Sequence, residues 1–228
     1  MKIIDAHSHI DYITHRIQTD VVGTVVCTID EFEWGVLINM MRHSDKIYGA
    51  FGIHPWRAQF VDSGFYLRLK SLLKTNRSLM VGEIGLDKFK PNMDKQIDVF
   101  TKQFDIAVEL QRRVVLHCVG AWDKILHILK SYSKSKLPTI IVHGFDDSLQ
   151  IMQNLLDNYD VVFSLGKNSV YGKNCRIEQI PDDKILVETD GKKDVFLIDL
   201  INEISKIKTN SNMADIIYKN TLKVLQNG

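Results

Sequence analysis

Histidines follow short apolar runs in this chain at spacings that suit metal binding. His7 and His9 come directly after a strand-like start at Ile3, and His54 follows another apolar run. Two residues that are two apart on an extended segment point to the same face, so His7 and His9 could chelate one divalent ion. A single His-x-His pair is more often structural than metal-binding, so further ligands have to support this interpretation.

Four further candidate ligands follow later apolar runs: Glu83, His117, His143 and Asp190. Singly, each is more often a satisfied polar residue, and Asp190 could instead cap a helix that begins near Asp194. Together with His7 and His9 they make four histidines and two carboxylates. Packed as a core, these groups would be desolvated without partners. The set therefore predicts a metal site.

The donor types narrow the predicted metal. Imidazole and carboxylate without thiolate suit Zn²⁺, Mn²⁺, Fe²⁺ or Co²⁺, and Mg²⁺ where more oxygens contribute. Two ions roughly 3.5–4 Å apart can activate a water and polarise a phosphoryl or acyl oxygen together. Glu83 is the candidate bridge between them. Asp190 could hold one ion and accept the proton of the attacking water, so we expect Glu83 and Asp190 to be catalytic.

Eight short β-branched runs, alternating with amphipathic stretches, would position these residues. The expected strands are Ile3–Asp5, Val22–Thr28, Ile47–Ile53, Leu79–Ile84, Val114–His117, Thr139–His143, Val161–Leu165 and Ile185–Glu188. The expected helices include Phe65–Lys74, Asp94–Gln111, Trp122–Lys130, Leu149–Leu156, Val195–Ile207 and Met213–Gln226. Apolar residues recur in these helices at spacings near three and four, which gives each helix one apolar face.

Strands that alternate with helices predict parallel pairing through right-handed crossovers. Eight such units in 228 residues indicate a closed (β/α)₈ TIM barrel, in which the C-terminal ends of the strands form one active-site face. A doubly wound sheet for a dinucleotide would carry a Gly-rich first turn, and Asp5-Ala6-His7-Ser8-His9 stands there instead. Because no linker or repeat divides the chain, we expect residues 1–228 to be a single domain.

Composition limits the classes of function. The net charge is +1, from 29 basic and 28 acidic residues, which argues against broad electrostatic wrapping of nucleic acid. Three cysteines without a C-x-x-C pair suggest reduced thiols. The chain starts without a leader-like segment, and no apolar run approaches the roughly 20 residues that span a bilayer. We therefore expect a cytoplasmic protein without a membrane partner.

The ordered motifs resemble those of the TatD-type metal-dependent deoxyribonuclease family of the amidohydrolase superfamily. The matching stretches are DAHSHID (Asp5–Asp11), GIHP (Gly52–Pro55), VGEIGLD (Val81–Asp87), LHCVGAWD (Leu116–Asp123), IVHGF (Ile141–Phe145) and ETD (Glu188–Asp190). They cover nearly the whole chain in the family's order. Asn220 also resembles a polar position of the family's last helix.

The resemblance implies two divalent metal ions, Mg²⁺, Mn²⁺ or Zn²⁺, in one barrel. His7, His9, Glu83 and Asp190 would bind one ion, and Glu83, His117 and His143 the other. His54 and Asp87 would lie at the rim, in contact with substrate phosphate or with the ligands. The implied activity is hydrolysis of DNA phosphodiesters, often from an end. Glu83 stands where other superfamily branches carry a carbamylated lysine, which favours the TatD-like branch.

Two departures from the family pattern leave other functions open. The connection after Asp190 is short where the family has a long basic loop, and Asp146 and Asp147 add negative charge near the expected site. This acidic pair could bind a cation, although capping of the next helix is the more common role. The alternatives are a hydrolase of small phosphoesters and a non-catalytic, metal-stabilised subunit of a larger assembly. The sequence does not fix the oligomeric state.

Several residues outside the predicted ligand set have more than one possible role. His15, His43 and His127 match no ligand position and are expected on the surface or in packing. Trp56 could stack on a base or act as a wedge between helices. The loop with Lys88, Phe89 and Lys90 could hold a nucleic-acid strand or be a solvated loop.

Overall fold

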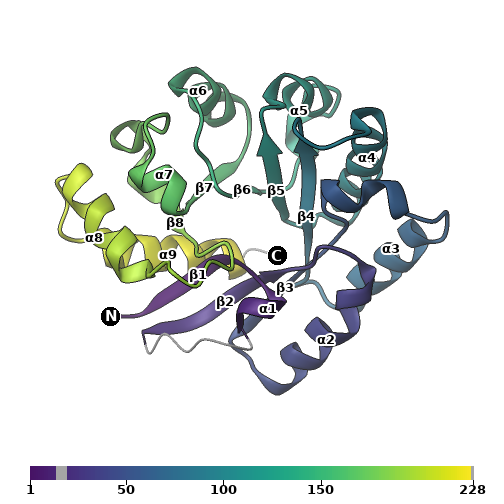
Figure 1. The fold of residues 1–228 in the computed structure, drawn as a ribbon, viewed down its shortest axis with the longest axis horizontal. Coiled ribbons are helices and arrows are strands. Elements are labelled where there is room, and N and C mark those ends of the chain that lie inside the picture. Colours follow the sequence, from purple (N-terminus) through teal and green to yellow (C-terminus); the bar gives the residue numbers. More distant parts are fainter. Residues whose placement is uncertain (14–19, 227–228) are drawn as a thin grey trace.

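The structure, a computed structural model, describes residues 1–13 and 20–226. Within these residues, eight parallel strands form one sheet in sequence order, and helices pack around it (Figure 1). The strands are β1 (Ile3–His9), β2 (Val21–Cys27), β3 (Ile47–Phe51), β4 (Met80–Asp87), β5 (Val114–Val119), β6 (Ile140–Val142), β7 (Val161–Leu165) and β8 (Ile185–Val187). The expected (β/α)₈ barrel is confirmed.

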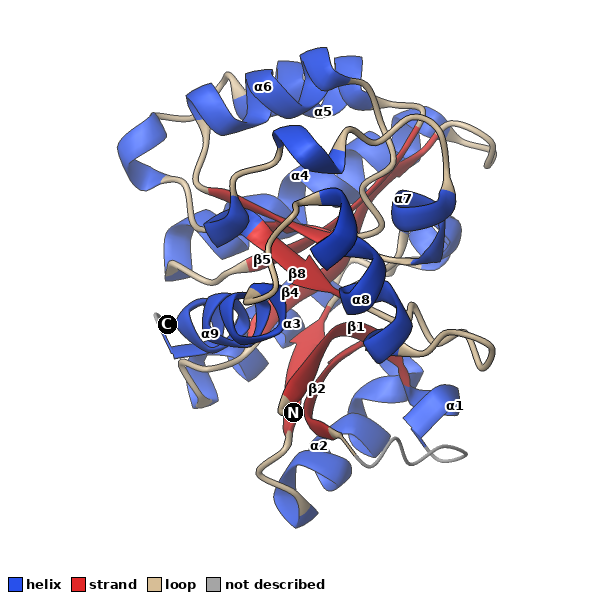
Figure 2. Ribbon diagram, turned by 90° about the vertical axis from the view of Figure 1, so that its left-hand side faces the viewer, coloured by secondary structure: helices blue, strands red, loops and turns tan. Residues whose placement is uncertain are grey.

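Helices follow most strands and cover the outside of the sheet, as the side view shows (Figure 2). They are α1 (Ile10–Ile13), α2 (Trp34–His43), α3 (Phe65–Thr75), α4 (Met93–Leu110), α5 (Trp122–Leu129), α6 (Leu149–Asn158), α7 (Lys167–Tyr171), α8 (Leu197–Ile207) and α9 (Met213–Gln226). Short 3₁₀ helices include η1 (Glu31–Glu33) and η2 (Pro55–Phe60). Among the described residues, no helix is long and apolar enough to cross a membrane.

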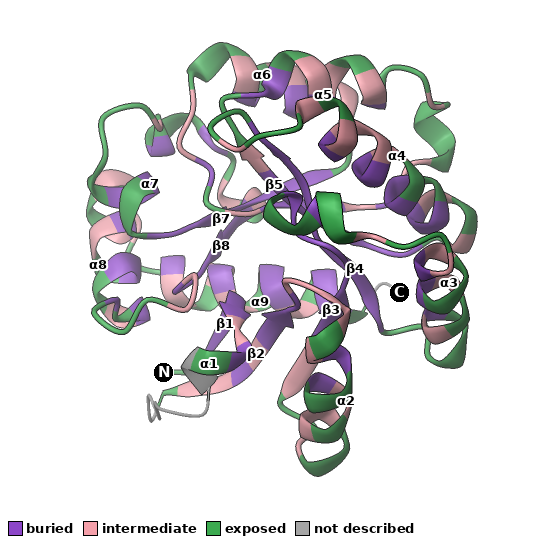
Figure 3. Cartoon of the chain, turned by 45° about the vertical axis from the view of Figure 1, so that its right-hand side comes forward, coloured by how far each residue is buried: buried purple, intermediate pink, exposed green. Residues whose placement is uncertain are grey.

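Two apolar layers hold the barrel together. The outer layer lies between the strands and the helices and includes Val114 and Leu116 of β5. The inner layer fills the barrel and includes Val115 of β5, together with Val224 and Leu225 of α9. Strands are therefore buried on both faces, while the outward faces of the helices are exposed (Figure 3). Residues of a strand alternate between its two faces.

The barrel closes differently between its last and first strands. Backbone ladders join each strand to the next from β1 to β8, but the described residues include no ladder between β8 and β1. Instead, the backbone N–H of Asp190 donates to the carbonyl of His7 at 3.0 Å. The backbone N–H of Thr189 donates to the Asp5 carboxylate at 3.0 Å. One backbone–backbone hydrogen bond and one backbone–carboxylate hydrogen bond thus complete the ring beside the candidate ligands.

Element boundaries differ from those expected at the ends that carry chemistry. β1 continues to His9 and β4 to Asp87, so His7, His9 and Asp87 also lie within strands, while Glu83 lies within β4 as expected. β4 and β5 pair closely at Gly85, whose φ is 152° and where a Cβ would overlap the carbonyl oxygen of His117. Only glycine is accommodated there. At the other end of the chain, α8 begins at Leu197, two residues later than expected.

The remaining histidines do not join the candidate site. His43 and His127 are exposed, as expected, and His43 Nδ1 lies 2.8 Å from the carbonyl of Asn39. His15 lies outside the described residues.

Candidate metal centre

Strand alternation directs the candidate ligands into the barrel mouth. Val115 belongs to the inner layer, so His117, two residues later on β5, faces the same side. Ile141 of β6 directs His143 inward in the same way. The inward side chains surround a cavity of about 130 Å³, whose lining residues are His9, Ile29, His54, Trp56, Glu83, His117, His143 and Asp190. The structure thus gathers all six residues expected as ligands, because His7 contacts the same cluster.

Glu83 lies at the centre of this cluster and is almost fully buried. One carboxylate oxygen, Oε1, is 2.6 Å from Nδ1 of His117. The same oxygen is 3.2 Å from Nε2 of His143 and 3.3 Å from Nε2 of His54. His54 is therefore buried among the candidate ligands, closer to the centre than the rim position that the family resemblance implied. Its expected contact with substrate phosphate stays a prediction.

The second carboxylate oxygen of Glu83 faces the histidines of β1. Oε2 is 3.2 Å from Nε2 of His7 and 3.6 Å from Nε2 of His9. Asp190 lies on the far side of this pair, with Oδ1 3.7 Å from His7 and 3.6 Å from His9. The two oxygens of Glu83 thus address two different sets of imidazoles, which is the arrangement that a bridging carboxylate needs.

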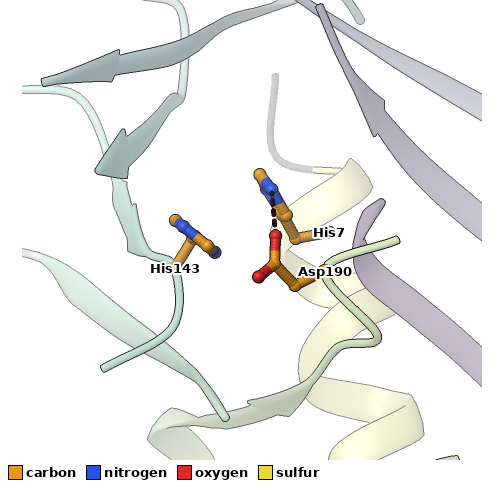
Figure 4. Close-up of side chains that lie close together, drawn as sticks. All are labelled: His7, His143 and Asp190. Carbon is orange, nitrogen blue, oxygen red and sulfur yellow. Dashed lines mark ion pairs between the residues drawn. The ribbon is translucent and has the colours of Figure 1, made fainter. Parts of the chain in front are cut away.

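Three sets of residues place one donor atom each within 4.8 Å of one another: His7 with His9 and Glu83; His54 with Glu83 and His117; His7 with His143 and Asp190. Figure 4 shows the last set, in which the His7 ring points toward the Asp190 carboxylate and His143 faces them from the opposite wall. The rings of His7 and His143 stack at a centroid distance of 4.0 Å. Neighbouring sets share ligands, as in a centre that binds more than one ion.

Unpaired buried atoms show that these residues fit a metal. Glu83 Oε2 and His117 Nε2 are buried and have no hydrogen-bond partner among the described residues. Leaving such polar atoms unpaired in a protein interior is costly, so they are normally satisfied by a partner or an ion. Imidazole and carboxylate are donors that divalent cations accept. The His, Glu and Asp groups of this cluster are therefore able to hold metal.

The electrostatics keep the carboxylate donors of the site ionised. Burial alone would raise the pKa of Glu83, but the charges of His143, His54 and His7 outweigh it and hold that pKa well below its usual range. Glu83 is therefore ionised. Burial lowers the pKa of His7, whereas at His143 burial is outweighed by the charges of Glu83 and Glu188, which raise its pKa. Burial would also raise the pKa of Asp190, but the hydrogen bond with His9 and the charge of His143 lower it.

A further shell of residues orients the cluster. Glu188 Oε1 accepts a hydrogen bond from Nδ1 of His143 at 2.9 Å. Asp87 is buried, accepts a hydrogen bond from the Trp56 indole at 2.7 Å, and lies 3.9 Å from Nε2 of His117. His117, together with the Trp56 hydrogen bond, lowers the pKa of Asp87 to about 2. Carboxylates at the second nitrogen of a histidine fix the orientation of that ring.

Glu188 was not predicted as a site residue, although the strand pattern of the sequence indicates its direction. Leu186 of β8 belongs to the inner layer, so alternation also directs Glu188 into the barrel. No role was predicted for Asp5, which is the first residue of the DAHSHID motif. It is buried, and burial raises its pKa to about 7.

None of the acidic residues considered as possible helix caps, Asp146, Asp147 and Asp190, is at the N-cap position of α6 or α8. Asp190 does not cap α8, whose N-cap position is Phe196. The cap of α6 is Ser148, whose hydroxyl accepts from the backbone N–H of Ile151. Asp146 instead accepts from the backbone N–H of Cys175 at 3.2 Å.

Asn220 has a structural role. Its side-chain amide is nearly buried in α9 and donates to the carbonyls of Asp182 and Ile185 at 2.8 and 3.0 Å. These bonds tie α9 to the start of β8.

Barrel, ligand cluster and motif order together define a metal-dependent hydrolase of the amidohydrolase type, and comparison with known proteins gives the family. The sequence matches the model of the family described as TatD related DNase over residues 4–226. The chain therefore belongs to this family, which confirms the resemblance seen in its motifs, and its centre fits a metal-dependent nuclease.

Relatives agree with this assignment. The human "3'-5' RNA nuclease TATDN2" is 30% identical over 172 residues, which are 72% of this chain and 22% of the human protein. The Rahnella "3'-5' ssDNA/RNA exonuclease TatD" is 30% identical over 66% of this chain and 59% of its own length. The chain thus spans only part of these two relatives. An "uncharacterized metal-dependent hydrolase" of Methanocaldococcus jannaschii is 27% identical over 98% of this chain and 96% of its own length.

The fold is shared with a solved structure of the family. The TatD homologue YJJV of Escherichia coli superposes with a TM-score of 0.85 over 97% of both chains, at 20% sequence identity. At this identity the similarity concerns the fold.

Proposed function

We propose that the chain, as a single domain, is an exonuclease that hydrolyses phosphodiester bonds of DNA with two divalent ions, Mg²⁺, Mn²⁺ or Zn²⁺. The observation that carries the proposal is the position of Glu83, whose two oxygens face separate sets of imidazoles at 2.6–3.6 Å. In this proposal, Glu83 joins the site of His7, His9 and Asp190 to that of His117 and His143.

Each residue has a distinct part in the proposed reaction. A bound pair of ions supplies Lewis-acid polarisation of the phosphodiester and lowers the pKa of the attacking water. Asp190 accepts the proton of that water, because its carboxylate is ionised and still partly exposed at the cavity. His54 lies beside Oε1 of Glu83, and in this proposal it contacts the substrate phosphate. Asp87 lies beside His117 and orients its ring.

The size of the cavity supports a polymeric substrate that reaches the centre by one end. Its volume of about 130 Å³ is below the range of roughly 300–1,000 Å³ that is typical of pockets enclosing a whole small ligand. The scissile phosphate fits there, and the rest of the nucleotide chain lies outside. The human relative, a 3'-5' RNA nuclease, and the Rahnella relative, a 3'-5' ssDNA/RNA exonuclease, support a nucleic-acid strand as the substrate class.

The test is an assay on end-labelled single- and double-stranded DNA with each metal, run beside Glu83→Ala. Metal-dependent shortening that is lost in the variant supports the proposal, and the product ladder gives the direction of cutting. Intact DNA in the presence of folded, metal-loaded protein refutes it.

The second candidate is a hydrolase of small phosphoesters. The short connection from Asp190 to α8 favours it, because Asp190 and Gly191 turn the chain at once through left-handed φ values of 54° and 65°. Rapid hydrolysis of small phosphoesters with intact DNA would establish it. A metal-stabilised, non-catalytic subunit would bind metal and hydrolyse neither substrate.

A further inference from the structure

We propose that an aromatic pocket beside the metal centre binds unpaired nucleobases of the substrate strand. This inference rests on the proposed nuclease function and names where the strand lies. The aromatic pocket is a cavity of about 650 Å³ whose walls include Phe32, Arg57 and Phe60, over a floor of Ile53 and Phe65. It lies in the loops that follow β2 and β3, at the same end of the barrel as the candidate ligands.

Two phenylalanines of this pocket are unusually exposed. Phe32 in η1 is 93% exposed and Phe60 in η2 is 68% exposed, whereas Ile53 and Phe65 below them are buried. Aromatic rings that flank a cavity next to an active site provide stacking surfaces for bases, and every base has a face that can stack. The volume lies within the range of pockets that enclose a small ligand.

The aromatic pocket lies next to the metal centre, because residues adjacent in the chain line the two cavities. Ile29 lines the metal cavity and the next residue, Asp30, lines the aromatic pocket. Trp56 and Arg57 divide between the two cavities in the same way. Consecutive Cα atoms are only about 3.8 Å apart. A strand whose scissile phosphate lies at the metal centre therefore brings neighbouring bases to the aromatic pocket.

The charges of the aromatic pocket favour bases over phosphates. Its acidic side chains are paired: Asp30 with Arg57 at 3.2 Å, and Glu31 and Asp62 with Arg68 at 2.5 and 2.7 Å. These pairs leave no excess positive charge for phosphate groups. The Arg57 guanidinium also lies 5.6 Å from the centroid of the Phe60 ring, which orients that ring.

Trp56 lines the metal cavity, directly before Arg57 of the aromatic pocket, and is half exposed. Its indole N–H donates to Asp87 at 2.7 Å, which fixes the plane of the ring. The ammonium of Lys90 lies 4.1 Å from the ring centroid, so positive charge for the backbone phosphates lies beside the metal cavity. Paired bases keep their faces inside the duplex stack, so the arrangement selects unpaired ends.

The test measures binding and cleavage in Phe32→Ala/Phe60→Ala. Binding of a fluorescein-labelled 12-nucleotide single strand is followed by anisotropy on metal-loaded protein in an Asp190→Asn background, so this readout does not depend on turnover. Loss of stacking should raise the Kd roughly 10- to 100-fold. Phe32→Trp/Phe60→Trp should restore binding. Leu67→Ala, which removes an exposed apolar side chain from α3, is the matched control and should bind as the wild type does.

A second substrate separates the outcomes. Cleavage is expressed as the ratio of kcat/KM on the single strand to kcat/KM on bis(p-nitrophenyl) phosphate, and this ratio should fall by a similar factor in the alanine variant. A strand with abasic sites next to the cleaved end should bind the wild type as weakly as the full strand binds the variant. If the wild type degrades DNA but the alanine variant has an unchanged Kd and an unchanged ratio, the aromatic pocket does not bind bases. The proposed nuclease function is then unaffected. Hydrolysis of the small diester alone by the wild type overturns both.

Discussion

The carboxylate of Asp5 accepts two hydrogen bonds from Thr189, one from the backbone N–H at 3.0 Å and one from the hydroxyl at 2.6 Å. The two residues are 184 positions apart in the sequence and both are buried. Asp5 is on the same strand as His7, and Thr189 directly precedes Asp190. This contact therefore sets the position of ligands from the two ends of the chain relative to one another.

Thr189→Val should destabilise the fold by about 1–3 kcal/mol, because it removes the hydroxyl donor and leaves one oxygen of buried Asp5 unpaired. Valine keeps the shape of the side chain. The measurement is the free energy of unfolding in urea. Thr139→Val is the matched control, since its hydroxyl donates to Asp160 at the surface. Equal losses of unfolding free energy in both variants would show that the Asp5 contact contributes no more to stability than a surface hydrogen bond does.

Asp190→Asn should reduce kcat by about 10²–10⁴-fold while the melting temperature changes little. The backbone at Asp190 has a φ of 54°, and asparagine tolerates this left-handed conformation, so the substitution removes the charge without adding strain. Turnover and thermal unfolding are measured on the same preparation. Parallel losses of activity and stability would argue against a catalytic role.

His117→Ala and His143→Ala should each lower the number of metal ions bound per chain, because both rings face Oε1 of Glu83. Metal analysis or native mass spectrometry gives the stoichiometry. His43→Ala removes an exposed histidine away from the centre and should leave the stoichiometry at the wild-type value. An unchanged metal count in the first two variants would mean that the second ion is bound elsewhere.

Glu188→Met should weaken metal binding about 10- to 100-fold, because His143 loses the carboxylate that orients its ring. Glu188→Gln keeps an oxygen that accepts from Nδ1 of His143 and should lose less. The metal Kd is determined by competition with a chelator, and circular dichroism checks the fold. If the two variants bind metal equally, the hydrogen bond does not orient His143.

Asp160→Asn should lower stability at neutral pH, and this effect should begin to decrease near about pH 4 and become small only below the lowered pKa of the folded state. Burial would raise the pKa of Asp160, but hydrogen bonds from Thr139 and Lys184 outweigh it and lower that pKa. A carboxylate with a lowered pKa stabilises the fold above its unfolded pKa, and this contribution is lost as the pH falls through the folded pKa. The side chain is largely exposed, so we expect less than about 1 kcal/mol. Unfolding curves at several pH values test this, and a pH-independent difference would contradict it.

Much of the fold was predictable because its signals are local. Strand alternation and helical periodicity each depend on neighbours within a few residues, and they gave the eight strands and the inward direction of His117 and His143. The convergence of six ligands followed once the barrel was assumed. These features need no knowledge of individual long-range contacts.

The rest of the site depends on contacts between distant residues. The partners of Asp5 and Glu188 lie on other strands, and no local pattern pairs residues 184 positions apart. The depth of His54 also follows from packing, since its ring lies against His117 at a centroid distance of 4.6 Å. The N-cap of α6 was not predicted for a related reason. Several polar residues precede this helix, and only the backbone conformation determines that Ser148 is at the N-cap position.

The described residues form no backbone ladder between β8 and β1, so a bound ion would also affect the stability of the barrel. His7 and His9 lie on one side of this gap and Asp190 lies on the other. Under the proposed function, an ion bound by all three residues would therefore link β1 to the segment after β8 and close the barrel. Metal binding then adds to folding stability in proportion to its affinity. Chelation would release the ring at this one place, where the Asp190 amide that donates to His7 would exchange its hydrogen first.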